Sequence, residues 1–556
     1  MAIEIRLLGT PCALVDGSRV RGPRGRKSWA VLAFLVLAEY PPSRRRLAEL
    51  LFAEADDPLG ALRWTLAELR RVLELDLGGD PVQLRWGPAD RVDVPHVEAI
   101  PDSDQLLDGL SVPDSPLFEG WLLIQRRRQA AVVHALLRET ALAELAAGHC
   151  KRSIELAARL VALAPLEEAG HTLLVRALAV AGDRTAAARA ADQCAALFEQ
   201  ELGVPPSAAV RAAVEAGIEY PSAPVLRGSA AARAQLKAGA AALAAGATDA
   251  GLDCLRRAVA EARRCDDAQL LSTSLTALGS ALVHAVRGRD EEGSAVLHET
   301  LQLTRSATAC RELGFVDVQA GRRVRATQWL DQARVAAAGD DHELAAIDGV
   351  RGMNLSDAGR YDEALPVLAG SVERALHCGS RRQAAWSASL IGRLHLLRGA
   401  FQDASVALRT SLELVEQERW LAFQPWPETF IAELDLATGS AETGLQRLTE
   451  AFALSCQLAD PCWEAVTARG LAVLRARTDP AAALSMFDDA RARCTRWPDT
   501  YQWVLGYTLD AACAAAVAAG DPSASRRADE LADLAARTDM AEFLQRAAGH
   551  LGTAGQ

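Results

Sequence analysis

The sequence contains no apolar run long enough to cross a membrane. A membrane-spanning helix needs about 18 or more consecutive apolar residues. The nearest candidate, residues 29–38, is shorter and lies between Lys27 and Glu39, so we expect a buried helix there. The first residues also lack the charged and then apolar pattern of a signal peptide. The sequence therefore predicts a cytoplasmic protein without a membrane partner.

Several patterns of catalysis, cofactor binding and metal binding are also missing. The 11 cysteines are an odd number and include no Cys-x-x-Cys pair, which argues against a disulfide framework and a zinc site. There is no His-Glu-x-x-His and no Gly-x-Ser-x-Gly element. The segment from Gly22 to Ser28 superficially resembles a phosphate loop, but Arg26 stands where the loop needs glycine. The sequence predicts no enzyme, no cofactor and no metal.

Lysine is scarce and the charge is unevenly distributed. Three of the 60 basic residues are lysine, a bias that indicates a high-GC bacterial genome. The net charge is −12, which alone argues against a nucleic-acid partner. Residues 1–72, however, hold twelve basic and eight acidic residues, so this segment carries +4 and the remainder −16. Any phosphate contact is expected in this first segment, unless the arginines cluster there by chance.

The first 95 residues combine short strands with three helices. Alternating Ile3, Ile5 and Leu7 and the turn Asp16-Gly17 predict two or three strands within 3–21. Helices are expected at about 26–39, 43–52 and 58–75, followed by a β-hairpin over 82–94. Strands, three helices and a terminal hairpin predict a winged helix-turn-helix domain at 1–95, an α+β unit.

The third helix carries the most informative pattern in the chain. Pro58 suits its first position, after Asp56 or Asp57 as cap. Its apolar face is formed by five leucines: Leu59, Leu62, Leu66, Leu69 and Leu73. The opposite side bears Trp64 and Arg71, with Arg63 and Arg70 on the flanks. A basic outer face on such a helix predicts a recognition helix that enters the major groove of DNA.

The expected contacts of this helix differ by residue. Arg63, Arg71 and Thr65 are candidates for contact with bases, and Arg70 for contact with phosphate. Trp64 either stacks on a sugar or a thymine methyl group, or packs on the domain behind the helix. Outside this helix, other basic residues are candidates for phosphate or minor-groove contact, the alternative being a solvated charge. They are Arg26, Lys27, Arg44, Arg45, Arg46, Arg85 and Arg91.

Beyond Leu117 the pattern becomes helical and repetitive. Gly148 and Gly182 are 34 residues apart, and each is followed by small or apolar residues at +5, +9 and +12. The same offsets fit turns at Gly246, Gly288, Gly321, Gly359, Gly399 and Gly439, a further unit with Thr478 in the glycine position, and a ragged unit around Gly520. A turn glycine and small residues where two helices cross are typical of tetratricopeptide-like repeats. A mainly α chain that ends in an α-solenoid is therefore predicted.

A Pro- and Ser-containing stretch at 220–229 reads as a linker and divides the helical part in two. We expect a compact helical domain at 96–223 and a solenoid at 224–556, which is a candidate sensor or protein-binding region. Within the solenoid, Trp420, Phe423 and Trp426 form the densest aromatic cluster. Packing of a bent repeat explains this cluster, and a groove for a peptide or small molecule is the alternative.

Short segments of the first two domains carry a further resemblance. In the first domain they are Ile5–Gly9, Gly17 with Val20, Arg26–Lys27 before Ala30–Ala33, Ser43–Arg44 with Leu47–Leu51, Ala61–Trp64 with Leu69–Arg71, and Val92–Val94. In the second domain they are Phe118–Gly120, Pro165–Glu168, Gly182–Arg184 and Leu202–Pro206. These segments resemble a known family, the Streptomyces antibiotic regulatory protein (SARP) type of transcriptional activator. Its members combine a winged helix of the OmpR/PhoB type with a bacterial transcriptional activator domain (BTAD).

The resemblance covers about 1–220 and has two departures. Phe52 stands where the family usually has Trp, and we expect it to fill the same core position. The ATPase that many larger relatives insert before the repeats is missing, since the linker passes straight into them. Residues 225–556 resemble only generic long-period tetratricopeptide arrays.

The resemblance implies a sequence-specific transcription regulator of bacterial promoters, more an activator than a repressor. It implies that the second domain supports a homodimer on direct repeats of double-stranded promoter DNA, and that it contacts RNA polymerase and its sigma factor. The solenoid is expected to respond to a protein or small-molecule effector. The alternative is a scaffold protein whose winged helix mediates protein contacts instead of DNA binding.

Overall fold

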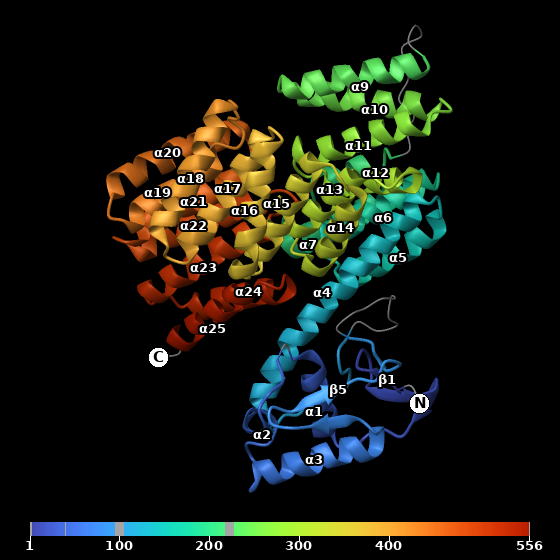
Figure 1. Cartoon of the computed structure of the whole chain (residues 1–556), viewed down its shortest axis with the longest axis vertical. Coiled ribbons are helices and arrows are strands. Elements are labelled where there is room, and N and C mark those ends of the chain that lie inside the picture. The colour runs from blue at the N-terminus through green and yellow to red at the C-terminus, as the bar shows by residue number, and fades with distance from the viewer. Residues whose placement is uncertain (1–2, 39, 95–104, 217–226, 555–556) are drawn as a thin grey trace. The chain divides into compact units, whose positions relative to one another are not determined.

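Figure 1 shows the computed structural model of the chain, in which residues 3–38, 40–94, 105–216 and 227–554 are described. These residues form six β-strands and twenty-five α-helices. The chain divides into two compact units, Met1–Leu136 and Leu137–Gln556. The mainly helical class, with a small N-terminal sheet and a helical-repeat array, is confirmed. None of the described helices is long and apolar enough to cross a membrane.

The first unit opens with a four-stranded sheet of order β3-β2-β1-β6. Its strands are β1 (Ile3–Arg6), β2 (Cys12–Val15), β3 (Ser18–Val20) and β6 (Arg91–Val92). β1 pairs antiparallel with β2 and parallel with β6, and the β2–β3 hairpin turns at Asp16-Gly17 as expected. Asp93, just after β6, accepts hydrogen bonds from the amides of Leu7 (2.7 Å) and Leu8 (3.0 Å). The carboxylate thus continues the β1–β6 connection beyond the two-residue strand.

Three helices follow close to the expected positions: α1 (Arg26–Leu37), α2 (Arg44–Leu51) and α3 (Pro58–Leu73). Ser43 caps α2, since its side chain accepts from the Arg46 amide. Phe52 is 5% exposed in the common core, as the resemblance predicted. The segment 29–38 is a buried helix rather than a membrane element, because α1 packs its middle into this core.

The hairpin predicted over 82–94 is wrong. The hairpin after α3 pairs β4 (Asp76–Gly78) with β5 (Gln83–Arg85), and β6 belongs to the N-terminal sheet instead. The partner of β5 therefore precedes the break at Gly79–Pro81 rather than following it. Helices α2 and α3 with the β4–β5 wing form a winged helix-turn-helix.

Helix α4 (Pro116–Ala146) begins in the first unit and ends in the second. Its first turns bury Phe118 and Leu122 in the same core as α1–α3, and Trp121 lies 4.8 Å from the Phe34 ring, between ring centroids. The Ser115 hydroxyl donates to the Leu51 carbonyl oxygen (2.9 Å). These contacts attach the start of α4 to the winged helix. The predicted boundary between the first two domains, at 95–96, lies outside the described residues.

The second unit is entirely helical in its described part. Its first helices after α4 are α5 (Cys150–Leu163), α6 (Glu168–Val180), α7 (Arg184–Leu202) and α8 (Ala208–Ala213). The predicted linker lies mostly outside the described residues, which resume at 227. The first half of the solenoid contains α9 (Ser229–Ala244), α10 (Thr248–Arg263), α11 (Ala268–His284), α12 (Asp290–Leu303), α13 (Ala307–Gln319), α14 (Arg323–Ala336), α15 (Asp341–Asp357) and α16 (Tyr361–His377). The second half contains α17 (Arg381–Leu397), α18 (Phe401–Gln417), α19 (Pro425–Ala437), α20 (Ala441–Leu458), α21 (Pro461–Ala476), α22 (Pro480–Cys494), α23 (Gln502–Ala519), α24 (Ala524–Arg537) and α25 (Ala541–Ala554).

The repeat pattern read from the sequence corresponds to buried helix crossings. The turn glycines from Gly148 to Gly439 all have positive φ, between 73° and 94°, where a side chain would be strained. The residues at +5, +9 and +12 from each of these glycines are buried. A further glycine, which the sequence analysis missed, stands seven residues before several turn glycines. At Gly392 an added Cβ would lie 2.4 Å from Leu408 Cγ, so this glycine lets the two helices approach.

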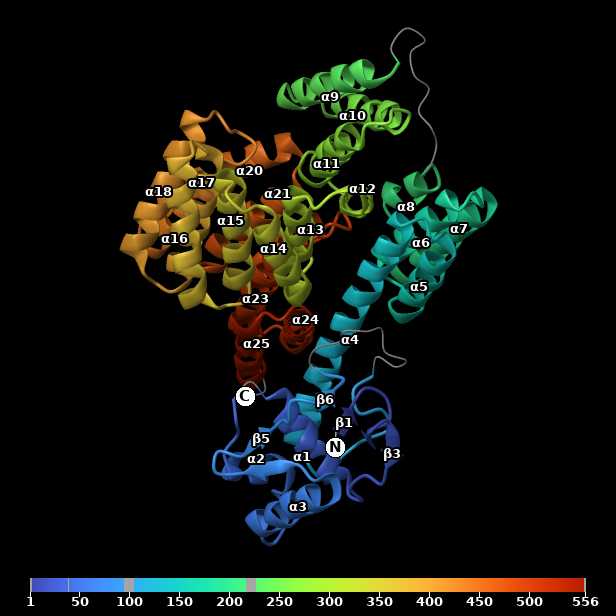
Figure 2. The same ribbon diagram turned by 45° about the vertical axis from the view of Figure 1, so that its right-hand side comes forward.

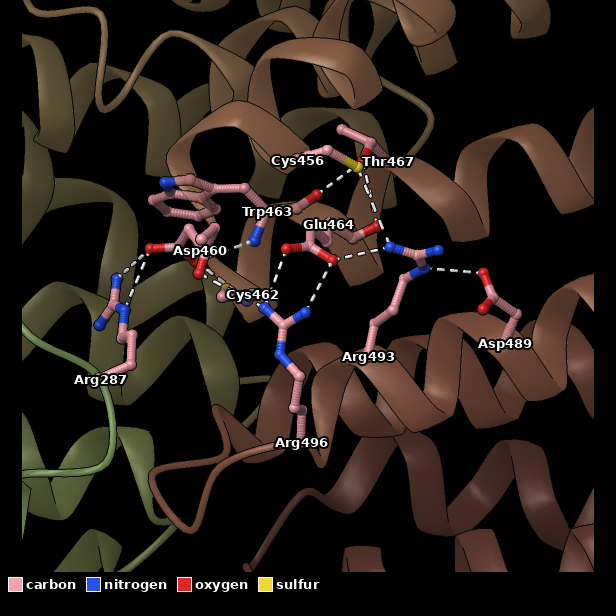
Figure 3. Close-up of polar contacts among 11 residues, drawn as sticks. Arg287, Cys456, Asp460, Cys462, Trp463, Glu464, Thr467, Asp489, Arg493 and Arg496 are labelled. Carbon is pink, nitrogen blue, oxygen red and sulfur yellow. Dashed lines mark hydrogen bonds and ion pairs between the residues drawn. The ribbon is translucent and has the colours of Figure 1, made fainter. Parts of the chain in front are cut away.

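The solenoid also closes on itself across many repeats (Figures 1 and 2). Arg287, before α12, donates to Asp460 at the start of α21 (Nε–Oδ2 3.0 Å), a pair drawn in Figure 3. Trp497 covers Gly288, and Arg323 donates to the Thr538 carbonyl oxygen (3.3 Å). Contacts over such separations are unusual for a repeat array, in which each unit normally contacts only its neighbours.

A buried arginine lies where these turns meet. Arg393 on α17 is fully buried, and its Nη2 donates to Asp357 Oδ1 (2.6 Å) while Nη1 donates to the Tyr501 hydroxyl (3.1 Å). Its guanidinium lies 4.0 Å from the Trp503 ring centroid. Trp426 is 2% exposed in the same core, so the aromatic cluster predicted around it is a packing feature.

Candidate nucleic-acid interface

The recognition-helix candidate, α3, begins and ends where its sequence directs. Asp57 Oδ1 accepts from the Gly60 amide (2.8 Å), and Pro58 occupies the first helical position. Glu74 ends the helix in the left-handed conformation. Four of the five predicted leucines, all except Leu59, are at most 3% exposed and anchor the helix on the domain core.

The opposite face of α3 is open to solvent. Trp64 is 67% exposed, so its packing against the domain behind the helix, one of two predicted fates, is wrong. The Arg63 side chain is also 67% exposed and makes only a long 3.5 Å ion pair with Asp57. Arg71 is exposed and has no hydrogen bond or ion pair among the described residues. The helix therefore presents one aromatic ring and two exposed guanidinium groups to solvent.

Two predictions for α3 are corrected by burial. Thr65 is 3% exposed and its hydroxyl donates to the Ala61 carbonyl oxygen (2.9 Å), so it cannot reach a base from its place in the core. Leu59 is 49% exposed, so it does not join the other four leucines in the core.

Arg70 is exposed and also forms a hydrogen bond with the wing. Its Nε donates to the Leu77 carbonyl oxygen of β4 (2.5 Å), which ties the end of α3 to the β4–β5 hairpin. On that hairpin Arg85 is exposed and makes a long 3.6 Å ion pair with Asp76. Trp86, directly after β5, is 38% exposed and was not among the predicted contacts. The wing thus offers an arginine and an aromatic side chain next to each other.

Glu68 is a positioning residue that the sequence analysis missed. It is 5% exposed, and its carboxylate accepts from the Ser28 hydroxyl (2.7 Å) and from the Arg24 amide (3.1 Å). These bonds fix α3 against the first turn of α1 and the loop before it. An acidic residue among the buried positions of an otherwise apolar face was the signal available in the sequence.

The remaining basic candidates differ in how they are held. Arg45 is exposed and its Nε donates to Glu49 (2.8 Å), and this hydrogen bond raises the pKa of Arg45. Arg46 is exposed at the start of α2. Arg44 Nε donates to the Gly79 carbonyl oxygen (3.0 Å), and this hydrogen bond connects α2 to the wing.

Three candidates lie elsewhere on the unit. Arg26 is exposed at the start of α1, while Lys27 is half-buried with its Nζ 5.2 Å from the centroid of the Phe52 ring. Arg91 is not on the wing as predicted, because it lies in β6 of the N-terminal sheet. Its guanidinium donates to the carbonyl oxygen of Asp90 (2.9 Å).

Among the described residues no group of three or more His, Cys, Asp or Glu is arranged to hold a metal ion. The chemistry of the α3 surface is that of cationic hydrogen-bond donors and aromatic faces. Such groups bind phosphates, base edges and thymine methyl groups.

Comparison with known proteins assigns the segment that follows the winged helix. Residues 103–216 match the family described as bacterial transcriptional activator domain. No curated protein matches the chain.

Solved structures with helical repeats are similar to the chain over long stretches. A Rap protein complexed with Competence and Sporulation Factor matches 59% of this chain and 99% of its own, at 12% identity and a TM-score of 0.42. Yeast Tom70 matches 79% and 91%, at 13% identity and a TM-score of 0.33. A signal transduction ATPase with a tetratricopeptide repeat sensor from Pyrococcus horikoshii matches 55% and 51%, at 14% identity and a TM-score of 0.37.

The segment that matches this family lies between two other parts of the described chain. A winged helix precedes it, and tetratricopeptide-like repeats follow it. The chain thus contains a segment similar to the bacterial transcriptional activator domain, and its resemblance to SARP-type activators with C-terminal repeats is confirmed.

Proposed function

We propose that this transcription regulator binds promoter DNA through its winged helix, with α3 in the major groove. The observation that carries the proposal is the solvent-exposed face of α3, on which Trp64, Arg63 and the unpaired Arg71 are all exposed. A guanidinium can donate two hydrogen bonds to one guanine, and the indole ring offers an apolar contact for a thymine methyl group.

The flanking elements fit contacts with the DNA backbone. Arg45 and Arg46 stand in the first turn of α2, and Arg85 stands with Trp86 on the wing. In helix-turn-helix proteins the first helix crosses the backbone while the second enters the groove. We assign α2 to phosphate contact and the wing to the adjacent minor groove.

The other two parts carry the regulatory steps. We propose that the activator domain supports dimerisation on direct repeats and contacts RNA polymerase and its sigma factor, as the family resemblance implies. The solenoid receives the regulatory signal, since stacked repeats offer large binding surfaces. Promoter-specific transcription with purified RNA polymerase, with and without the protein, tests the contact.

The DNA proposal is tested by binding of the full chain to the promoter upstream of its own gene, measured across a range of salt concentrations. Specific binding that weakens steeply as salt rises is expected, because phosphate contacts release counterions. Arg71→Ala should cost about 1–3 kcal/mol and relax discrimination between operators. Arg409→Ala, an exposed arginine on α18, is the matched control and should bind like the wild type.

The scaffold alternative predicts a different result. A winged helix that mediates only protein contacts gives absent or salt-insensitive DNA binding, with no difference between the Arg71 and Arg409 variants. Either outcome would overturn the DNA-binding proposal.

A further inference from the structure

A cavity of about 930 Å³ lies within the second unit and opens between turns of the activator domain and turns of the solenoid. Leu166 and Leu202 line it from the α5–α6 and α7–α8 turns, and Trp497 and Pro498 line it from the α22–α23 segment. Pockets for small molecules commonly have volumes of about 300–1,000 Å³ and mostly apolar walls with a few placed polar groups. The cavity has the size of such a pocket, and its wall combines an apolar part with a polar part of similar extent.

The polar groups in this cavity are mostly acceptors. Asp290, the first residue of α12, is 7% exposed, lines the cavity and has no side-chain hydrogen bond or ion pair among the described residues. Asp499 lies against it, since Asp499 Oδ2 accepts from the Asp290 amide (3.2 Å). Glu291 and Gln502 also line the cavity, and each has one buried side-chain oxygen without a partner, Oε2 and Oε1 respectively.

The charges around Asp290 leave it uncompensated. Burial and the neighbouring Asp499 raise the pKa of Asp290, and burial raises the pKa of Asp499 to about 6 although amides at the start of α12 lower it. The positive charge of Arg287 lowers the pKa of Asp290, but Arg287 is already paired with Asp460 (Figure 3). Glu291, which raises both pKa values, is paired through its other oxygen with Arg138 (2.7 Å).

The arginines of the cavity wall are paired with acids outside it. Arg496 donates to Glu464 (2.9 Å), and Figure 3 shows both Arg493 and Arg496 reaching toward this carboxylate. Arg322 donates to Asp317 (2.6 Å). The arginines of the wall are therefore already neutralised by other acids and, among the residues described, do not form ion pairs with the acceptors in the cavity. A buried carboxylate without a partner is costly, and a cation with several N–H donors would relieve that cost.

We propose that this cavity binds a small organic cation that carries a protonated amine or guanidinium group, with Asp290 as its main acceptor. Gln502 Oε1 and Asp499 accept the remaining donors, while Trp497, Leu166 and Leu202 contact the apolar body of the ligand. No group of three metal-ligating residues occurs in the described part of the chain, so the donor set fits N–H donors better than a metal ion.

The position of the cavity gives the ligand a regulatory consequence, and this step alone rests on the proposed function. A ligand that contacts both the activator domain and the repeats stabilises their packed arrangement by mass action. The effector predicted for the solenoid would then be a cation held at this junction.

Isothermal titration calorimetry on the full chain, without DNA, tests the site. The probes are the diamine putrescine and the guanidinium compound agmatine, with the uncharged 1,4-butanediol as comparison. We expect saturable binding of at least one cation and none of the diol. Asp290→Asn should weaken that binding at least tenfold, and Asp403→Asn, an exposed aspartate in the first turn of α18, should leave it unchanged.

The pH dependence provides a second readout. Affinity should rise as the pH increases through about 6, because Asp499 must lose its proton before it pairs with a cation. Asp499→Asn should weaken binding in the same direction and serves if Asp290→Asn fails to fold. The proposal is wrong if neither cation binds at about 10 mM, if the diol binds equally, or if Asp290→Asn binds like the wild type. Since DNA is absent from the assay, failure here leaves the DNA proposal intact, and the converse also holds.

Discussion

Glu68 holds the recognition helix without facing the DNA, and removing its carboxylate gives a quantitative prediction. Glu68→Ala deletes the acceptor of the Ser28 hydroxyl at 2.7 Å and of the Arg24 amide at 3.1 Å. Hydrogen bonds to a charged group contribute about 1.5–3 kcal/mol each. Ser28 is 2% exposed, so its hydroxyl stays buried without a partner, whereas the Arg24 amide regains water. We expect a net loss of about 3 kcal/mol.

The assay is amide hydrogen exchange of α1 and α3 in the full chain, followed by mass spectrometry. A loss of about 3 kcal/mol corresponds to exchange faster by about two orders of magnitude, since each 1.4 kcal/mol is tenfold. The matched control is Glu49→Ala, which removes an exposed pair with Arg45. Such pairs contribute about 0–1 kcal/mol, so α2 exchange should change little.

The reasoning is refuted if exchange in α3 is unchanged by Glu68→Ala, or if both variants accelerate exchange equally. Promoter affinity gives the functional readout. It should fall in the Glu68→Ala variant although the residue touches no DNA, because α3 is no longer fixed against α1. Glu68→Gln keeps one acceptor for Ser28 and should restore part of both effects.

Further predictions concern the solenoid. Gly392→Ala places a Cβ 2.4 Å from a leucine side chain and should lower the melting temperature, at a cost of about 1–3 kcal/mol. Gly370→Ala, where an added Cβ meets nothing within 4 Å, should instead raise it slightly through helix propensity. Asp357→Asn leaves the buried Arg393 without its counter-charge and should cost about 3–5 kcal/mol in denaturant unfolding; an unchanged midpoint would contradict this. Burial raises the pKa of Asp499 to about 6, so protonation of Asp499 stabilises the folded protein. This stabilisation is lost as the pH rises through about 6. Melting temperature should therefore fall more between pH 5 and about pH 7 in the wild type than in Asp499→Asn, and parallel curves would exclude this contribution.

Local patterns predicted much of this molecule. The cap at Asp57 with Pro58 placed the start of α3, and the turn glycines placed the repeats. Both signals act over a few residues and depend on backbone conformation and capping. The burial of Thr65 was also accessible, since it lies between Leu62 and Leu69 on the apolar side of the helix.

The wrong hairpin over 82–94 arose because short strands pair according to their tertiary context. β4 and β5 have three residues each and β6 has two, too few for a hydrophobic alternation to indicate a partner. β6 pairs parallel with β1, almost ninety residues earlier in the sequence. Such pairing depends on the packed core and leaves no local pattern.

The sequence also did not predict the cavity lined by hydrogen-bond acceptors. Asp290 and Asp499 are far apart in the chain and belong to different repeats. As the first residue of a helix, Asp290 looks like an ordinary favourable acidic residue. Only the closing of the solenoid on itself brings the second carboxyl group against it.

The closed solenoid has a consequence for how this protein can change. An open repeat array tolerates gain or loss of a unit, because each repeat touches only its neighbours. Here Gly321 lies against Thr538, and Tyr361 donates to Glu542, so the last helices complete the packing of the middle ones. Inserting or deleting a repeat between them would shift every such pairing out of register. The number of repeats in this array is thus fixed by its own closure, and folding of the C-terminal half is expected to be cooperative rather than unit by unit.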